Sequence, residues 1–200
     1  MFPSKFQLDG KCFMNQLAQK IAHYCIVFDF ISADDFEWCA YGIEKRITAF
    51  ITGFTLTLIG IVLFGIKRTF SFVFPFHFLR KRSSGYHAPT YISCFFSSIL
   101  LEIFCISISS IIHPCFCFLI LIFSNATIWL FSPCNNIYIH LTNDESSILQ
   151  SMSRIRLTVV NILCVIFFFL SIELFCNIVV AIFADACLLI IPKIKKGCST

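Results

Sequence analysis

The sequence changes character at the segment Arg80-Lys-Arg-Ser-Ser-Gly-Tyr-His-Ala-Pro-Thr-Tyr-Ile-Ser-Cys94, a polar stretch between two long apolar stretches. Apolar runs of about 20 residues cross a bilayer as helices, so this polar stretch is expected to end one membrane helix and begin another. Proline disfavours helix at the residue before it and suits the first residue of a new helix, which predicts a helix start near Pro89. Gly85 permits a sharp turn ahead of that start. The segment therefore predicts a turn between two membrane helices.

The same segment carries a thiol and an imidazole, the pair from which a cysteine nucleophile and its base are built. On one straight helix, His87 and Cys94 would be separated by about 10.5 Å along the axis, which is too far for proton transfer. A turn before Pro89 lets His87 fold back towards Cys94. Cys94 itself is expected just beyond the first helical turn, where the positive end of the helix dipole stabilises a thiolate. The basic residues 80–82 act in the same sense.

The order of these residues resembles the signature of the accessory gene regulator B family of bacterial quorum-sensing peptidases. The resemblance consists of the basic cluster, then Gly85-x-His87-Ala88-Pro89, then four residues and Cys94 at the head of a membrane span. It implies a multi-pass membrane endopeptidase that cuts a small signal-peptide precursor on its C-terminal side. The family also helps to convert the product to a cyclic thiolactone or lactone. By this resemblance His87 is the general base and Cys94 the nucleophile.

The resemblance also implies where the substrate binds. The residues expected to contact it are Arg80, Lys81, Arg82 and Gly85, and the basic ones would attract an acidic C-terminal stretch of the precursor. They also serve as positive charges that keep their loop in the cytoplasm. The resemblance implies a homodimer, although no interface motif appears in the sequence. No cofactor is expected.

Composition excludes an ordinary soluble enzyme. The chain of 200 residues is 58% hydrophobic and 13% charged, and it contains 26 Phe, so its solvent is mostly lipid. We therefore predict an all-α polytopic membrane protein with about six transmembrane or re-entrant helices and amphipathic N-terminal helices. The net charge of +4 is explained by cytoplasmic loops, and no nucleic-acid partner is expected.

The chain divides into three predicted regions: residues 1–46, residues 47–191 and residues 192–200. The first is expected to form interfacial or cytoplasmic amphipathic helices, the second the membrane domain and the third a basic cytoplasmic tail. Apolar side chains recur at helical spacing near the N-terminus, at Phe13, Leu17, Ile21, Tyr24 and Phe28. Ser32, followed by Asp34 and Asp35, predicts the start of a second helix.

Apolar runs predict membrane spans at about residues 47–66, 91–112, 115–131, 157–175 and 178–191, with a tight turn at Asn177 between the last two. A sixth apolar piece, 69–79, is short and contains Pro75 and His77. We expect it to be either a short, tilted span or a re-entrant segment.

Positive charges predict the orientation of these spans. With six crossings and both termini in the cytoplasm, every Lys and Arg except Lys67 and Arg68 falls on the inner side. This places His87 and Cys94 at the cytoplasmic face of a bacterial cell membrane, where thiols stay reduced and a precursor peptide can reach them.

Most of the 12 cysteines lie within apolar runs and are expected to behave as small hydrophobic residues. Cys115 and Cys117 beside His113 have metal-ligand chemistry but lack a convincing fourth ligand, so no metal site is predicted.

Four polar residues within the spans, Glu102, Asn161, Glu173 and Asp185, are expected to point into the bundle. Either they make helix-packing hydrogen bonds or one of them orients His87. A different class of function also remains open: a small membrane transporter or metal-handling protein, with the pathway lined by His77, His87, Cys94 and the buried acids.

Overall fold

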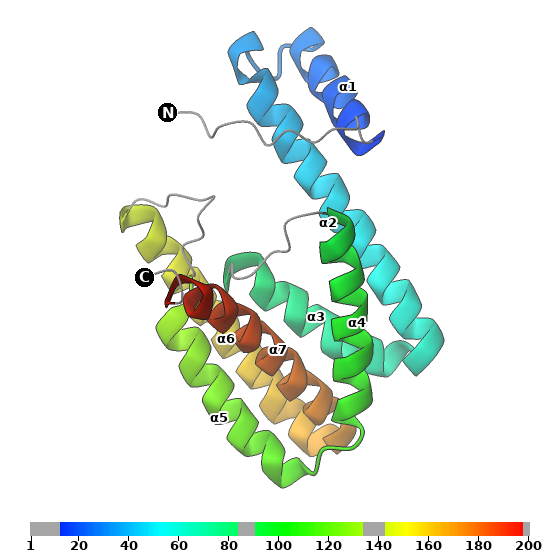
Figure 1. Cartoon of the computed structure of the whole chain (residues 1–200), viewed down its shortest axis with the longest axis vertical. Helices are drawn as coiled ribbons and strands as arrows, with labels where there is room; N and C mark the ends of the chain where they lie inside the picture. Colours follow the sequence, from blue (N-terminus) through cyan, green and yellow to red (C-terminus); the bar gives the residue numbers. More distant parts are fainter. Residues whose placement is uncertain (1–12, 84–90, 134–142, 198–200) are drawn as a thin grey trace. The chain divides into compact units, whose positions relative to one another are not determined.

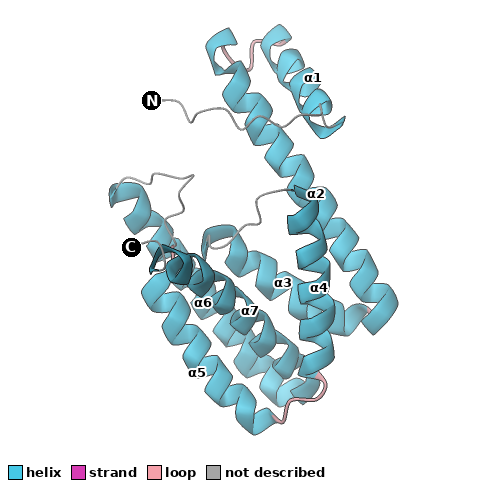
Figure 2. Cartoon of the chain, viewed as in Figure 1, coloured by secondary structure: helices cyan, strands magenta, loops and turns pink. Residues whose placement is uncertain are grey.

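The protein is built from helices. The computed structural model describes residues 13–83, 91–133 and 143–197, and within these ranges every regular element is a helix, as Figure 2 shows. The α-helices are α1 (Phe13–Val27), α2 (Phe36–Phe64), α3 (Ile66–Ser83), α4 (Tyr91–Ser109), α5 (Pro114–Phe131), α6 (Asn143–Leu170) and α7 (Ile172–Gly197). A short 3-10 turn, Ala33–Asp35, precedes α2. The predicted all-α class is confirmed.

Five helical segments of the described chain are long and apolar enough to cross a membrane. They are Ala33–Phe64, Ile92–Ser109, Pro114–Phe131, Ser146–Leu170 and Ile172–Pro192. Helix α3 is not among them because Lys67 and Arg68 near its start and the basic residues 80–82 at its end leave a short apolar centre. The chain is a multi-pass membrane protein, as its composition predicted.

The chain folds as two compact units, residues 1–55 and residues 56–200. The first unit contains α1, on which the apolar side chains of Ile21 and Tyr24 are exposed. The chain turns after α1 at Asp29, which has a φ of 56°. The hydroxyl of Ser32 then donates to the carboxylate of Asp35 at 2.8 Å, directly before α2.

Helix α2 continues without a break to Phe64. The predicted boundary between residues 46 and 47 therefore lies inside a helix, and its assignment to cytoplasm and membrane stays a prediction.

Helix α7 is the core of the second unit. Of its candidate span 67% is buried, whereas the other four candidate spans are 11% to 22% buried. Helices α3, α4, α5 and α6 all pack against it (Figure 1). Fully buried apolar side chains line it on several faces, among them Phe175, Ile178, Val179, Ile182 and Leu189. A helix that is apolar all round is the one that a bundle encloses.

Helices α3 and α7 run side by side in the same direction. Near their starts, the guanidinium of Arg68 pairs with the carboxylate of Glu173. Near their ends, the hydroxyl of Ser83 donates to Asp185 at 2.9 Å. These contacts are separated by about 22 Å along α3 and about 18 Å along α7 at the α-helical rise. Helix α3 therefore follows α7 over most of the length of its candidate span and does not turn back, so it is not a re-entrant hairpin.

The predicted turn between the last two spans was wrong. Helices α6 and α7 meet at Ser171, and the predicted turn residue Asn177 lies inside α7, fully buried. Its amide oxygen accepts a hydrogen bond from the hydroxyl of Ser109 on α4, so the polar side chain joins two helices instead of making a turn. Helix α2, which contains the first predicted span, ends at Phe64, close to the predicted end. The next residue, Gly65, has a φ of 81°, a left-handed conformation that glycine adopts without strain.

Candidate active site

The predicted basic cluster forms the last turn of α3. Cationic side chains are favourable there because the carbonyl end of a helix carries partial negative charge. Lys81 is exposed, Arg80 and Arg82 are half-buried, and the next residue, Ser83, is fully buried. The cluster is therefore partly turned into the bundle, and Lys81 is its most accessible cation.

A buried carboxylate on α7 holds this end of α3. Asp185 has no exposed surface, and its Oδ1 accepts a hydrogen bond from the hydroxyl of Ser83 at 2.9 Å. The same oxygen lies 3.9 Å from a guanidinium nitrogen of Arg80. The other carboxylate oxygen, Oδ2, is buried and has no hydrogen-bond partner. The end of α3 is thus anchored by an ionic contact and a hydrogen bond to one residue.

Helix α6 contributes a second anchor. The guanidinium of Arg156 donates to the backbone carbonyl of Phe78 at 2.7 Å, and it lies 4.7 Å from the centre of the Phe78 ring. Two residues earlier on α6, the guanidinium of Arg154 lies 4.6 Å from the centre of the Trp129 ring. Arginine side chains of α6 therefore contact α3 next to the basic cluster and also contact α5.

Cys94 lies just beyond the first turn of α4, as predicted from Pro89. The helix begins at Tyr91, and Cys94 is a free, half-exposed cysteine. Its backbone carbonyl accepts a hydrogen bond from the hydroxyl of Ser98 at 2.8 Å, one turn further along the helix. The thiol is therefore partly accessible near the N-terminus of a helix.

Two predicted site residues, Gly85 and His87, lie outside the described residues. The proposed folding back of His87 towards Cys94 stays a prediction. The structure describes the chain up to Ser83, the last residue of α3, and again from Tyr91, the first residue of α4. It therefore describes the helices before and after the segment that carries His87.

The other polar residues of the spans lie elsewhere. Glu173 pairs with Arg68 at the opposite end of α3. Glu102 on α4 is buried, its two carboxylate oxygens have no hydrogen-bond partner, and it lies close to Gly60 and Thr69. Asp185 alone among the four predicted candidates contacts the end of α3 that precedes His87.

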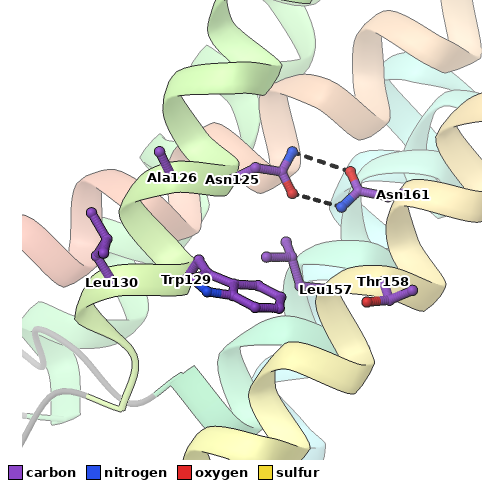
Figure 3. Close-up of a pocket in the computed structure, with 7 residues that line it drawn as sticks. All are labelled: Asn125, Ala126, Trp129, Leu130, Leu157, Thr158 and Asn161. Atoms are coloured by element: carbon purple, nitrogen blue, oxygen red, sulfur yellow. Dashed lines mark hydrogen bonds between the residues drawn. The ribbon is translucent and has the colours of Figure 1, made fainter.

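The fourth candidate, Asn161 on α6, pairs with Asn125 on α5. Each side-chain amide donates to the oxygen of the other, at 3.1 Å and 2.6 Å (Figure 3). Trp129, Leu157 and Thr158 lie beside this pair, and together they line an open groove of about 460 Å³. The pair joins α5 to α6 and is not in contact with the basic cluster in any described interaction.

His113, Cys115 and Cys117, where no metal site was predicted, make other contacts. The side chain of His113 caps the start of α5 by accepting from the backbone N–H of Cys115 at 3.4 Å. Cys115 is exposed, whereas Cys117 is fully buried beside Cys176, with the two sulfurs 3.3 Å apart. In the described part of the chain, no group of three or more His, Cys, Asp or Glu side chains is placed to hold a metal ion.

The transporter alternative depended on an interrupted helix at residues 69–79. Helix α3 is continuous through Pro75, and two pairs of stacked rings span that residue: Phe72 with Phe76 and Phe74 with Phe78. This segment is therefore not a broken helix of the kind that marks transport sites.

Sequence reasoning missed Ser83 and Arg156. Ser83 is an ordinary serine in the sequence, and Arg156 was counted only for its charge. A pairing over 102 residues, such as that of Ser83 with Asp185, leaves no pattern in a single sequence.

Comparison with known proteins gives one match. A family model described as Accessory gene regulator B matches residues 14–191. No curated protein and no solved structure matches the chain.

Proposed function

The chain belongs to the accessory gene regulator B family, whose members process quorum-sensing peptides, and from this membership we propose that it is a membrane cysteine endopeptidase. Its proposed substrate is a small autoinducer precursor peptide, cut on its C-terminal side. The observation that carries the proposal for this chain is the half-exposed thiol of Cys94 near the start of α4.

In the proposed mechanism, His87 accepts the proton of the Cys94 thiol. The thiolate attacks the carbonyl carbon of the scissile peptide bond, and the C–N bond then breaks. The imidazolium returns the proton to the departing amine, so the C-terminal fragment leaves neutral at that atom. The N-terminal fragment remains as a thioester on Cys94.

The second step releases this fragment as a ring. A thiol or hydroxyl within the peptide attacks the thioester carbonyl and forms a thiolactone or lactone, while the Cys94 thiolate leaves and takes up the proton. Because a thioester and a thiolactone have similar acyl energies, much of the energy of the bond is kept. The protein favours cyclisation over hydrolysis by holding the two ends of the peptide close together.

The basic residues at the end of α3 are proposed to bind an acidic C-terminal stretch of the precursor. Lys81 is exposed, and Arg80 and Arg82 are partly accessible, which suits a contact with a peptide at the membrane surface. Gly85 is also proposed to contact the substrate, and to permit the turn by which His87 folds back towards Cys94. Replacing Arg80, Lys81 and Arg82 together with Gln is expected to raise KM. If the topology and the cleavage rate are unchanged, these residues do not bind substrate.

The proposed location follows from the charges. We place both termini, the basic cluster and Cys94 at the cytoplasmic face, and we take the family's homodimer as the proposed assembly. Because α3 and α7 run in the same direction, their basic ends, at residues 80–82 and at the C-terminal tail, fall on the same side.

The proposed function is tested by co-expressing the protein with the precursor peptide encoded beside it. Cys94→Ala and His87→Ala are expected to insert normally and to reduce cleavage by about a thousandfold or more, since removing a nucleophile or its base has effects of this order. Cys94→Ser tests whether an oxygen nucleophile retains any activity.

Cys115→Ala is the matched control, since Cys115 is also a free, exposed cysteine near a helix start but lies outside the motif. It should cleave at the wild-type rate. If Cys94→Ala also cleaves at the wild-type rate, the assignment is wrong.

A further inference from the structure

Four polar residues of the spans were candidates to support the proposed base, and the structure separates them by position. Glu173 and Glu102 lie near the start of α3, beside Arg68 and Thr69 respectively. Asn161 is engaged with Asn125 on α5. Only Asp185 contacts the end of α3 from which the chain continues to His87.

The environment of Asp185 is costly for a carboxylate. The side chain is completely buried in the most enclosed helix of the unit, and one of its oxygens has no hydrogen-bond partner. Burying a charge with a single distant cation often gives no net stability, so helix packing alone does not require an acid at this place. An asparagine would accept the same hydrogen bond from Ser83.

The contacts of Asp185 point to what the acid does. Its Oδ1 accepts a hydrogen bond from the hydroxyl of Ser83 at 2.9 Å. The same oxygen lies 3.9 Å from a guanidinium nitrogen of Arg80. Ser83 is the last residue of α3 and stands four positions before His87. Fixing Ser83 and Arg80 therefore fixes the point from which the segment with the proposed base departs. Small misplacements of a catalytic group, of about 1 Å, cost about a hundredfold in rate.

We propose that Asp185 is a positioning residue of the proposed peptidase reaction, which holds Ser83 and Arg80 so that the segment carrying His87 starts at a fixed place. The inference rests on the proposed function and adds to it a residue on α7, about 100 positions away in the sequence. Asp185 does not touch the reacting atoms; it acts through the end of α3.

The first test compares Asp185→Asn with Glu173→Gln in cleavage of the co-expressed precursor. Asp185→Asn keeps the shape and an acceptor for Ser83 but removes the charge that faces Arg80. A loss of positioning should lower kcat by about tenfold or more and leave KM within about twofold. Glu173→Gln removes the acid that joins the same two helices at their other end, and it should change neither value by more than about twofold.

The second test does not need the precursor. Iodoacetamide alkylates thiolates, and mass spectrometry of the peptide with Cys94 gives the rate at this one cysteine. If His87 is held beside Cys94, both His87→Ala and Asp185→Asn should slow the alkylation of Cys94 at neutral pH at least about threefold. Glu173→Gln should leave this rate unchanged.

Ser83→Ala provides a milder variant in case Asp185→Asn does not insert. It removes one hydroxyl and should lower both kcat and the alkylation rate in the same direction. Wild-type kcat and alkylation in Ser83→Ala and in inserted Asp185→Asn would overturn the positioning role. An equal loss in Glu173→Gln would also overturn it, because the effect would then belong to helix packing in general.

The two proposals fail separately. If Cys94→Ala still cleaves the precursor, the proposed function is wrong. If Cys94→Ala is inactive while Asp185→Asn has wild-type kcat and alkylation, only the role of Asp185 is wrong.

Discussion

Helices α3 and α7 are joined at both ends by ionic contacts, one exposed and the other buried. At one end Arg68 and Glu173 form a pair whose side chains are 39% and 45% exposed. At the other end Asp185 is completely buried and joins Arg80 and Ser83. The same two helices thus carry one accessible ion pair and one that is enclosed by the bundle.

The difference teaches that burial, not the presence of an ion pair, decides how much a contact constrains the helices. An exposed pair exchanges contacts with its surroundings, so each partner can be lost at small cost. A buried acid cannot exchange its partner for water. Removing its cation therefore leaves a buried negative charge that nothing compensates. The buried contact adjoins the proposed active site, whereas the exposed pair lies at the far end of α3.

The largest loss of stability is expected when the cation at the buried end is removed. Arg80→Met should lower the free energy of unfolding by about 3 kcal/mol, because it leaves the carboxylate of Asp185 buried without its guanidinium. The measurement is unfolding in mixed micelles by titration with SDS. Lys81→Met, at the exposed neighbour, should cost about 0.5 kcal/mol or less. Equal losses in the two variants would remove the distinction between buried and exposed charges.

A smaller loss of stability is expected from a substitution near the start of α3, where the helices pack closely. A methyl group on Gly60 would lie 2.5 Å from a carboxylate oxygen of Glu102 and 2.6 Å from the methyl group of Thr69. Gly60→Ala should therefore destabilise the protein by about 2 kcal/mol through overpacking, measured by the same titration.

Gly42→Ala is the control for this substitution, since nothing lies within 4 Å of the added methyl group. It should be neutral or stabilising by up to about 1 kcal/mol, as expected for alanine in a helix. If Gly60→Ala is as stable as Gly42→Ala, the close approach of α2, α3 and α4 at this point does not restrict the helices.

A neutral polar pair should contribute a free energy between those of the two ionic contacts. A double-mutant cycle of Asn125→Ala and Asn161→Ala should give a coupling free energy of about 0.6 to 1 kcal/mol, the usual range for hydrogen bonds between membrane helices. Thr158 lines the same groove but donates to the backbone carbonyl of Arg154. A cycle of Asn125→Ala with Thr158→Ala should therefore show coupling close to zero, and comparable values in both cycles would refute a specific Asn pair.

The smallest effect is expected at the exposed end of α3. Glu173→Gln should cost about 0.5 kcal/mol or less, and the difference from wild type should shrink further when the salt concentration is raised. A loss as large as that of Arg80→Met, unchanged by salt, would show that this pair is as constraining as the buried one.

Much of this organisation was predictable from the sequence because its signals are local. Apolar runs of membrane length predicted the spans, and Pro89 predicted the start of the helix that carries Cys94, which begins at Tyr91. The basic residues 80–82 marked the end of the preceding helix, which includes them in its last turn.

The errors came from residues whose partners are distant in sequence. Asn177 was interpreted as a turn residue because asparagine favours turns, but it lies inside the bundle, where its amide oxygen accepts a hydrogen bond from the hydroxyl of Ser109. Pro75 suggested an interrupted segment, but packing of α3 along α7 keeps the helix continuous around it.

The sequence by itself determined that this is a helical membrane protein and which segment carries the candidate chemistry, since composition, apolar length and motif order are properties of neighbouring residues. Only the tertiary structure decided that α7 is the enclosed helix, that α3 runs along it in the same direction, and that Asp185 meets Ser83 and Arg80. These choices depend on which faces pack together. In a chain whose helices are nearly all apolar, the pattern of hydrophobic residues does not distinguish one face from another.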